Sequence, residues 1–207
     1  RTGTKTLAYA EDYFAVAEAA LALFESNGRV DLLELAVAAA DQGFDKTAPV
    51  EDEGESDQLL ARFTVWDIPW MSPDDQTCRS VYGMALRVSR MLAILTTQER
   101  WMERQRKLIQ SMRWLGNDWL LFASSSFLTE VFSARSDQSL MVVPLKDRES
   151  WQDRYRQLSG EASPYETCLL RCSEATTKLS ADQRELLNEE VLSASEGEGI
   201  EVLAIDP

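Results

Sequence analysis

The sequence predicts an all-α protein, either a multi-helix bundle or stacked helical hairpins, with about eight helices. Three observations support this class: apolar residues recur at helical steps of three and four, capping residues precede these runs, and the alternation typical of strands is scarce. The chain has 207 residues, enough for a single domain with a buried core. With 44% hydrophobic and 27% charged residues, we expect a soluble globular protein.

Residues 1–44 predict a helical hairpin. Apolar residues repeat on one helical face over residues 5–26. The sequence Ser-Asn-Gly at residues 26–28 is suited to end this helix, because Asn and Gly tolerate the left-handed conformation. A second helix is expected over residues 30–42, closed by Gly43. The turn between the two helices is so short that they must be antiparallel neighbours.

Residues 45–57 predict a flexible acidic linker. The segment holds six carboxylates, Pro49 and Gly54, and it has few apolar side chains to bury. A calcium-binding loop is the alternative, but Pro49 and Leu60 stand where the first and last ligands of such a loop would be. We therefore expect a solvated linker, followed by a main helical bundle over residues 58–195.

Capping signals divide the main bundle into successive helices. Ser72 and Pro73 have the residue types of a helix start, and an apolar seam follows them. Thr96 with Glu99 fits a capping box that opens the next helix, and residues 116–118 end it and cap a further one. The first seam consists of Val81, Ala85, Val88, Leu92 and Leu95, widened by Met84 and Met91. The second consists of Trp101, Leu108, Met112 and Leu115.

The C-terminal third is also expected to be mainly helical. One helix covers residues 147–160, and the sequence Ser-Pro-Tyr-Glu at 163–166 is the strongest local signal for a helix start in the chain. A final helix over residues 180–195 begins with another capping box. The tail after it should fray, with residues 200–205 as an edge strand or a docked end. Residues 140–145 form a weak strand at best, because the fifth of them is proline.

The absence of histidine excludes the most common catalytic and metal-binding arrangements. Ser-His-Asp and Cys-His catalysis, His-containing zinc and iron sites and His-ligated haem all need this residue. The phosphate-binding loop, the dinucleotide fingerprint and the Gly-x-Ser-x-Gly motif are also absent from the sequence. We therefore expect no catalytic residue, no bound metal and no cofactor.

The three cysteines indicate packing and compartment rather than chemistry. Cys168 and Cys172 are four residues apart on an expected helix, so their thiols would face the same way. A structural zinc needs four ligands, and only Cys78 could add a third thiolate, so we interpret the pair as small buried hydrophobes. An odd number of cysteines in a chain of this size favours a reducing intracellular compartment.

The first residue of the sequence and the length of its apolar runs add expectations about processing and membranes. The chain begins with Arg1 rather than Met, which we interpret as a trimmed or mature form whose targeting segment, for example to an organelle, has been removed. No apolar run approaches the roughly 20 residues that span a bilayer, so we expect no transmembrane segment.

Charge is distributed unevenly along the chain, and this is the main functional clue. Residues 1–60 contain 4 basic and 13 acidic side chains (net −9), and residues 161–207 contain 3 and 11 (net −8). Residues 79–113 contain 8 basic and 2 acidic side chains (net +6). The total of −14 repels phosphates, so we expect no nucleic-acid partner. The basic centre suits an acidic partner, either the ends of the same chain or another protein.

The candidate partner-binding residues form two groups. The basic group lies on two successive helices, and a solvated polar face is the alternative interpretation. The aromatic group is a loop that a proline would hold extended, and the alternative is that its tryptophans cover the core. The basic group consists of Arg87, Arg90, Arg100, Arg104 and Lys107, and the aromatic group of Trp66, Pro69 and Trp70.

These features favour a non-catalytic protein-interaction module, such as an adaptor, a chaperone or an accessory subunit of a hetero-oligomeric assembly. The alternative is a carrier that holds an apolar small molecule between helices lined by Met84, Met91, Phe122 and Phe127. An enzyme with cysteine or carboxylate chemistry is a third, less favoured interpretation. A carrier should contain a closed apolar cavity, whereas an interaction module should expose an apolar patch.

Overall fold

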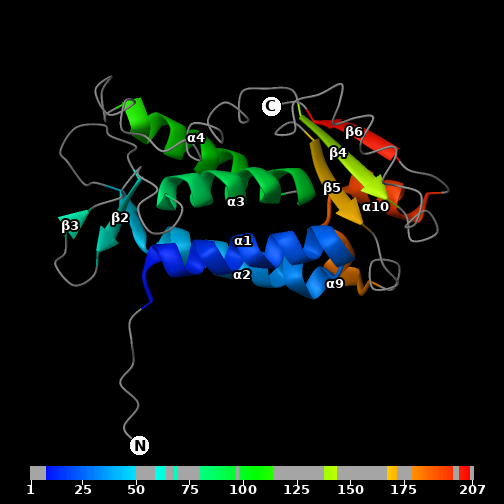
Figure 1. The fold of residues 1–207 in the computed structure, drawn as a ribbon, viewed down its shortest axis with the longest axis horizontal. Helices are drawn as coiled ribbons and strands as arrows, with labels where there is room; N and C mark the ends of the chain where they lie inside the picture. Colours follow the sequence, from blue (N-terminus) through cyan, green and yellow to red (C-terminus); the bar gives the residue numbers. More distant parts are fainter. Residues whose placement is uncertain are drawn as a thin grey trace, which may run out of the picture.

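The computed structural model shows a mostly helical fold, as the sequence predicts (Figure 1). It describes residues 8–49, 59–63, 68–69, 80–96, 98–113, 138–143, 167–171, 179–197 and 201–205. The helices in these ranges are α1 (Ala10–Asn27), α2 (Val30–Asp45), α3 (Val81–Leu95), α4 (Arg100–Arg113), α9 (Ala181–Leu186) and α10 (Glu189–Glu196). The strands are β1 (Thr47–Pro49), β2 (Leu59–Phe63), β3 (Ile68–Pro69), β4 (Gln138–Val143), β5 (Thr167–Arg171) and β6 (Glu201–Ile205). The described ranges hold six helices, so the predicted number of eight is not established.

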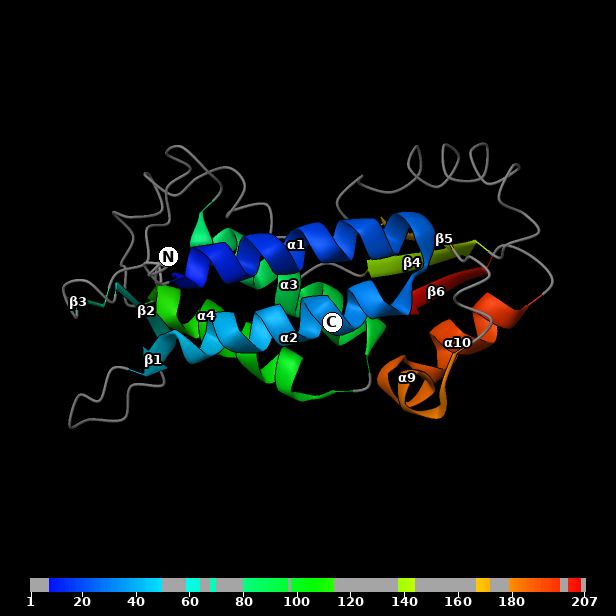
Figure 2. The ribbon, with the colours of Figure 1, turned by 90° about the horizontal axis from the view of Figure 1, so that it is seen from below.

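Two layers of helices form the body of the molecule (Figures 1 and 2). The α1–α2 hairpin is one layer, and α3 and α4 lie on one side of it as the second. Strands β1, β2 and β3 lie at one end of these layers, and β4, β5 and β6 lie at the other end with α9 and α10. The core includes Phe14, Phe24, Leu33, Leu92 and Trp101, all of them fully buried.

The helical hairpin forms as the sequence predicts. Gly28 follows α1 in the left-handed conformation, with φ of 65°, and its N–H donates to the carbonyl of Phe24 at 2.7 Å. This conformation is easily adopted by glycine, and it lets α2 begin at Val30 and run back along α1.

Gly43 does not end the second helix, contrary to the prediction. It lies inside α2, which continues to Asp45. A Cβ atom at this position would lie 3.0 Å from two ring carbons of Phe14. The glycine is therefore a packing residue that lets the buried Phe14 ring approach the backbone of α2.

Helix α3 is the most enclosed helix that the structure describes. Every residue of its predicted seam is buried, but so are most residues on its other sides, including Tyr82 and Ser89. It begins after Ser80, whose hydroxyl accepts a hydrogen bond from the N–H of Gly83 at 3.3 Å. The proposed cap at Ser72 lies outside the described residues.

The turn between α3 and α4 differs from the predicted capping box. The Thr96 hydroxyl donates back to the carbonyl of Leu92 at 2.6 Å and accepts the N–H of Gln98 at 3.4 Å. Helix α4 begins only at Arg100. Thr96 therefore closes the end of α3 instead of opening α4.

Strand β5 is the largest error in the predicted fold. A helix was expected over these residues, but Thr167–Arg171 pairs in parallel with β4, which in turn pairs antiparallel with β6. The apolar β4 offers a buried partner, with Leu140 and Val143 fully buried. Pairing with this distant segment outweighs the local helix signal. A strand does form near residues 140–145, but β4 is the buried central strand of its sheet rather than the weak strand expected, and β6 lies at the edge of the sheet, near the expected residues 200–205.

The last predicted helix is divided in two. It begins as expected, because the hydroxyl of Ser180 accepts the N–H of Gln183 and the Gln183 side chain accepts the N–H of Ser180. The helix stops at Leu187, which is 1% exposed and forms a β-bridge with Thr96. Asn188 then donates its N–H to the carbonyl of Leu95 at 3.0 Å and caps α10.

The start of the predicted linker is also structured. Residue 45 ends α2, and Thr47–Pro49 pairs antiparallel with Leu59–Phe63. The remainder of that segment, residues 50–57, lies outside the described residues.

Candidate interaction surface

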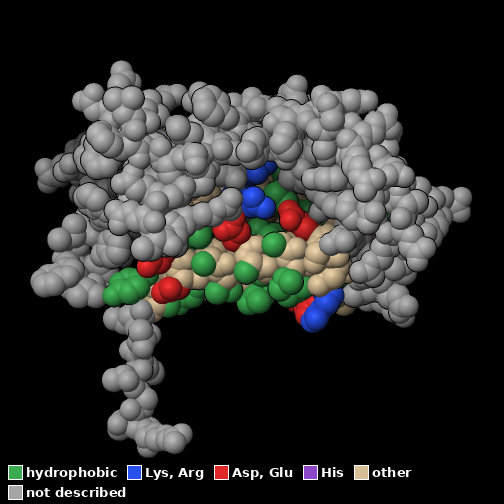
Figure 3. Space-filling view, in the orientation of Figure 1, with side chains coloured by type: hydrophobic (Ala, Val, Ile, Leu, Met, Phe, Trp, Pro, Cys, Tyr) green, Lys and Arg blue, Asp and Glu red, His purple; other side chains and the backbone are tan. Residues whose placement is uncertain are grey.

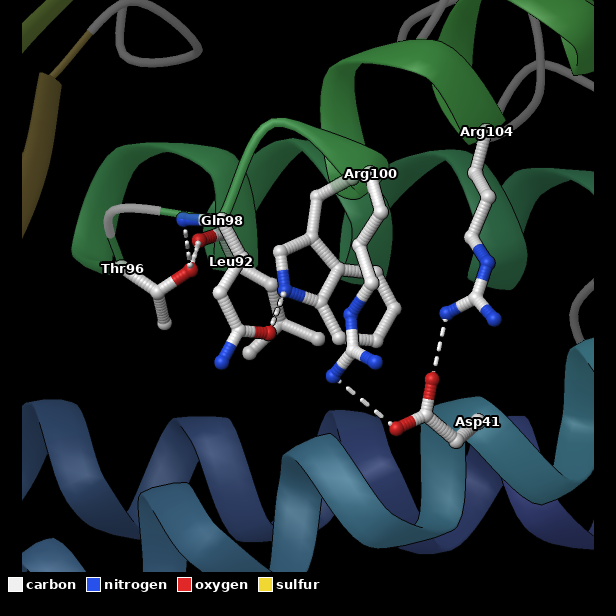
Figure 4. Close-up of polar contacts among 7 residues, drawn as sticks. Asp41, Leu92, Thr96, Gln98, Arg100 and Arg104 are labelled. Carbon is white, nitrogen blue, oxygen red and sulfur yellow. Dashed lines mark hydrogen bonds and ion pairs between the residues drawn. The ribbon is translucent and has the colours of Figure 1, made fainter. Parts of the chain in front are cut away.

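Two arginines of the basic group converge on one carboxylate of the hairpin. Asp41 on α2 contacts Arg104 Nη1 through Oδ1 at 2.6 Å and Arg100 Nη2 through Oδ2 at 3.0 Å. Figure 4 shows both arginines reaching from α4 to Asp41. The two oxygens of a single carboxylate thus hold α4 against α2.

The rings of Phe44 and Trp101 also contact these two arginines. The guanidinium carbon of Arg104 lies 4.6 Å from the ring centre of Phe44 and 4.7 Å from that of Trp101. Arg100 also lies 4.7 Å from the Trp101 ring centre. The Trp101 indole N–H donates to Gln98 Oε1 at 3.1 Å, so the buried ring has its polar group satisfied. Planar guanidinium groups suit such rings, so the arginines are positioned by stacking as well as by charge.

A second cluster of charges joins α1 to α3. Arg87 Nε lies 3.3 Å from Glu18 Oε1, and both side chains are partly buried. Burial raises the pKa of Glu25, and the charges of Arg87 and Arg90 only partly oppose this effect. Arg90 itself is 7% exposed. These side chains belong to the packing between the two layers.

Lys107 contacts an acid of its own helix, α4. Its Nζ lies 3.5 Å from Glu103 Oε1, and Arg106 makes two hydrogen bonds of 2.7 and 2.8 Å with the same carboxylate. These contacts lower the pKa of Glu103, chiefly through the hydrogen bond from Arg106. Arg87, Arg100 and Arg104 therefore contact acids of the N-terminal hairpin, whereas Lys107 contacts an acid of its own helix.

The other predicted residues contribute little to a described site. Trp66 and Trp70 lie outside the described residues, and Pro69 is placed only as part of β3, which pairs with β2. Of the predicted carrier lining, Met84 and Met91 are buried in the core, and Phe122 and Phe127 lie outside the described residues.

The helix predicted around Cys168 is wrong. Cys168 lies in β5, so the helical spacing assumed between it and Cys172 does not apply through this strand. Cys78 and Cys172 lie outside the described residues. Among the residues that the structure does describe, no three Cys, Asp or Glu side chains are grouped as a metal site would require.

Sequence reasoning missed three aliphatic side chains on the outside of the hairpin. Val16 and Leu23 on α1 are 47% and 52% exposed, and Leu35 on α2 is 47% exposed. We call these three residues the aliphatic strip. Figure 3 shows hydrophobic side chains gathered along the described hairpin, with acidic side chains beside them.

Helix geometry places the strip on the outer face. Val16 and Glu18 are two residues apart, which puts them about 160° apart around α1. Because Glu18 contacts α3, Val16 faces away from that helix, and Leu23, seven residues on, shares its face. On α2, Leu35 lies about 120° around the helix from Asp41, which contacts α4. Figure 2 shows this outer side of the hairpin with no described helix or strand in front of it.

The sequence contains a signal for this face. Besides its buried positions, α1 has apolar residues at five exposed positions with helical spacing, so its apolar surface extends around most of the helix. The five are Ala15, Val16, Ala19, Ala22 and Leu23.

Models of protein families, curated proteins and solved structures all gave no match to the chain. None of the helices in the described ranges has the length and apolar character needed to cross a membrane.

Proposed function

We propose that the protein is a non-catalytic interaction module, an adaptor or accessory subunit, that binds another protein through the outer face of the α1–α2 hairpin. The observation that supports this most strongly is the aliphatic strip. Single exposed apolar residues are common, but Val16, Leu23 and Leu35 are all about half exposed on two helices that pack against each other. Covering the exposed halves of these side chains would contribute about 1 kcal/mol each.

The internal ion pairs give this surface a rigid support. Asp41 and Glu18 fix the hairpin to α4 and α3, so its outer face is held in one orientation without a partner. A preformed surface loses little conformational entropy on binding. In this proposal the basic group holds the hairpin in place, and the outer face of the hairpin contacts the partner protein.

Substitution of the strip tests the proposal. We expect the double variant Val16→Gln/Leu23→Gln to lose at least about tenfold of its binding to proteins that the full chain retains from the cells that make it, since buried aliphatic anchors dominate interfaces of this kind. Met102→Gln is the matched control, because Met102 on α4 is 53% exposed but lies outside the hairpin. Both variants should melt near the wild-type temperature. Retention of every partner by a folded double variant would contradict the proposal.

A further inference from the structure

We infer that the partner presents an amphipathic helix whose apolar face is flanked by lysine or arginine. This inference rests on the proposed function and specifies the partner of the same surface. Three features of the hairpin support it: the shape of the strip, the small residues around it and the sign of the charges at its edges.

The spacing of the strip suits a helix. Val16 and Leu23 are seven residues apart on one face of α1, about 10 Å along the helix axis. An amphipathic helix repeats its apolar side chains with the same seven-residue spacing, so it can contact both positions at once. Leu35 extends the strip from α1 onto α2, so a docked partner helix can contact both helices of the hairpin.

Small side chains allow close approach beside the strip. Ala15, Ala19 and Ala22 are exposed on α1 between and beside the two larger residues. A methyl group adds little height above the helix backbone, so the side chains of a docked helix can insert between Val16 and Leu23. This stretch of α1 has no exposed charged residue between Ala15 and Leu23.

The charges at the edges of the face are predominantly acidic. Residues 8–46 contain 8 acidic and 2 basic side chains, and three of the acids, Glu18, Glu25 and Asp41, lie on the inner side near arginines of α3 and α4. Glu18 and Asp41 are directed inward to arginines, whereas Asp12, Glu34 and Asp45 are exposed. The exposed Arg29 contacts Asp31, so its charge is locally balanced. A partner with basic flanks therefore gains attraction along the edges of the strip.

A second copy of the chain fits this surface less well. Symmetric pairing would bring the acidic edges of two identical faces together, in a protein with a net charge of −14. The strip contains only three large side chains, each about half exposed. The apolar area that it could bury is therefore much less than that of a standard interface, which buries about 800 Å² per partner. Attraction between opposite charges can compensate for this small apolar area, whereas repulsion between like charges cannot.

A displayed peptide library tests the inference. Helical peptides with a seven-residue apolar repeat, randomised at the flanking positions, would be selected against the full chain. We expect the enriched peptides to carry Lys or Arg at the flanks. Each should bind at least about tenfold more weakly to Val16→Gln/Leu23→Gln and should bind unchanged to Met102→Gln. Glu34→Gln/Asp45→Asn should slow association and reduce its salt dependence.

The outcomes separate this inference from the proposed function. Enriched peptides without a basic bias would overturn the inference about charge, and so would the absence of any strip-dependent peptide. If the cellular partners are still lost with the strip variant, the proposed function stands in both cases. Concentration-dependent dimerisation that Val16→Gln/Leu23→Gln abolishes would assign the strip to a second copy and would also overturn the inference.

Discussion

The contact between Asp41 and Arg104 provides a quantitative test of how the hairpin is held. Their atoms lie 2.6 Å apart, and the side chains are 27% and 21% exposed. Exposed ion pairs contribute about 0–1 kcal/mol, whereas loss of one partner from a buried pair costs about 3–5 kcal/mol. The intermediate burial of this pair places its coupling energy at about 1–2 kcal/mol.

A double-mutant cycle measures that coupling. The variants Asp41→Asn, Arg104→Met and their combination would be unfolded in urea, with helical circular dichroism as the readout. Asn keeps the shape of the carboxylate, and Met keeps part of the aliphatic stem. Arg104→Lys is a separate probe of stacking. It keeps the charge but loses the planar contact with the Phe44 and Trp101 rings, about 0.5–1 kcal/mol for each ring.

The pair of Glu103 and Arg106 is the matched control. Its contact is as short, at 2.7 Å, but both side chains are nearly half exposed, so we expect a coupling below about 0.5 kcal/mol. If the coupling of Asp41 with Arg104 were no larger than this control, the ion pair would not hold the hairpin. The proposed role of the basic group as a support would then be wrong.

Three further substitutions test the fold. Gly28→Ala should destabilise the protein by about 1 kcal/mol in urea unfolding, because φ of 65° disfavours a residue with a Cβ atom. Gly43→Ala should also destabilise it, by about 1–2 kcal/mol, because the new Cβ meets the fully buried Phe14 ring at 3.0 Å and this overrides the helix propensity of alanine. A stabilised Gly43→Ala variant would show that the ring can move. Burial raises the pKa of Glu25 above its ordinary value of 4.5, so the folded state binds this proton more tightly than the unfolded chain does. The contribution of Glu25 to stability therefore falls as pH rises from 4.5 through the raised pKa. We expect Glu25→Gln to be more stable than wild type at neutral pH, with the difference vanishing below pH 4.5, and an equal difference at all pH values would contradict this reasoning.

The parts of the fold that local signals determine could be predicted from the sequence. Gly28 ends α1 because its backbone conformation is a local property, and α3 forms over its predicted seam because the apolar spacing matches the helical period. The capping box at Ser180 likewise depends only on residues within one turn.

The errors arise where a distant residue decides the local structure. Strand β5 depends on β4, almost 30 residues earlier, and no local pattern records that pairing. Gly43 looks like a helix stop in isolation, but the ring of Phe14 explains its presence inside α2. The final helix breaks at Leu187 because this residue pairs with Thr96 at the end of α3.

The charge pattern of the sequence predicts the contacts on the inner surface of the hairpin better than the exposure of its outer surface. Opposite net charges on residues 8–46 and on α3 and α4 indicate attraction, and the contacts of Asp41 and Glu18 agree with this. The sequence does not tell which side of the largely apolar α1 is covered, because both sides have helical spacing. Packing against α2 and α3 covers one side and leaves Val16 and Leu23 exposed.

The excess of acidic residues therefore has different consequences on the two sides of the hairpin. On the inner side, arginines of α3 and α4 balance Glu18 and Asp41, so burial of these acids is compensated. On the outer side, Asp12, Glu34 and Asp45 remain exposed around an aliphatic strip. Glu34 and Asp45 are accordingly the residues whose substitution should leave stability nearly unchanged while it alters association with a basic partner, whereas the Asp12 carboxylate also accepts the N–H of Tyr9 at 2.8 Å and caps α1.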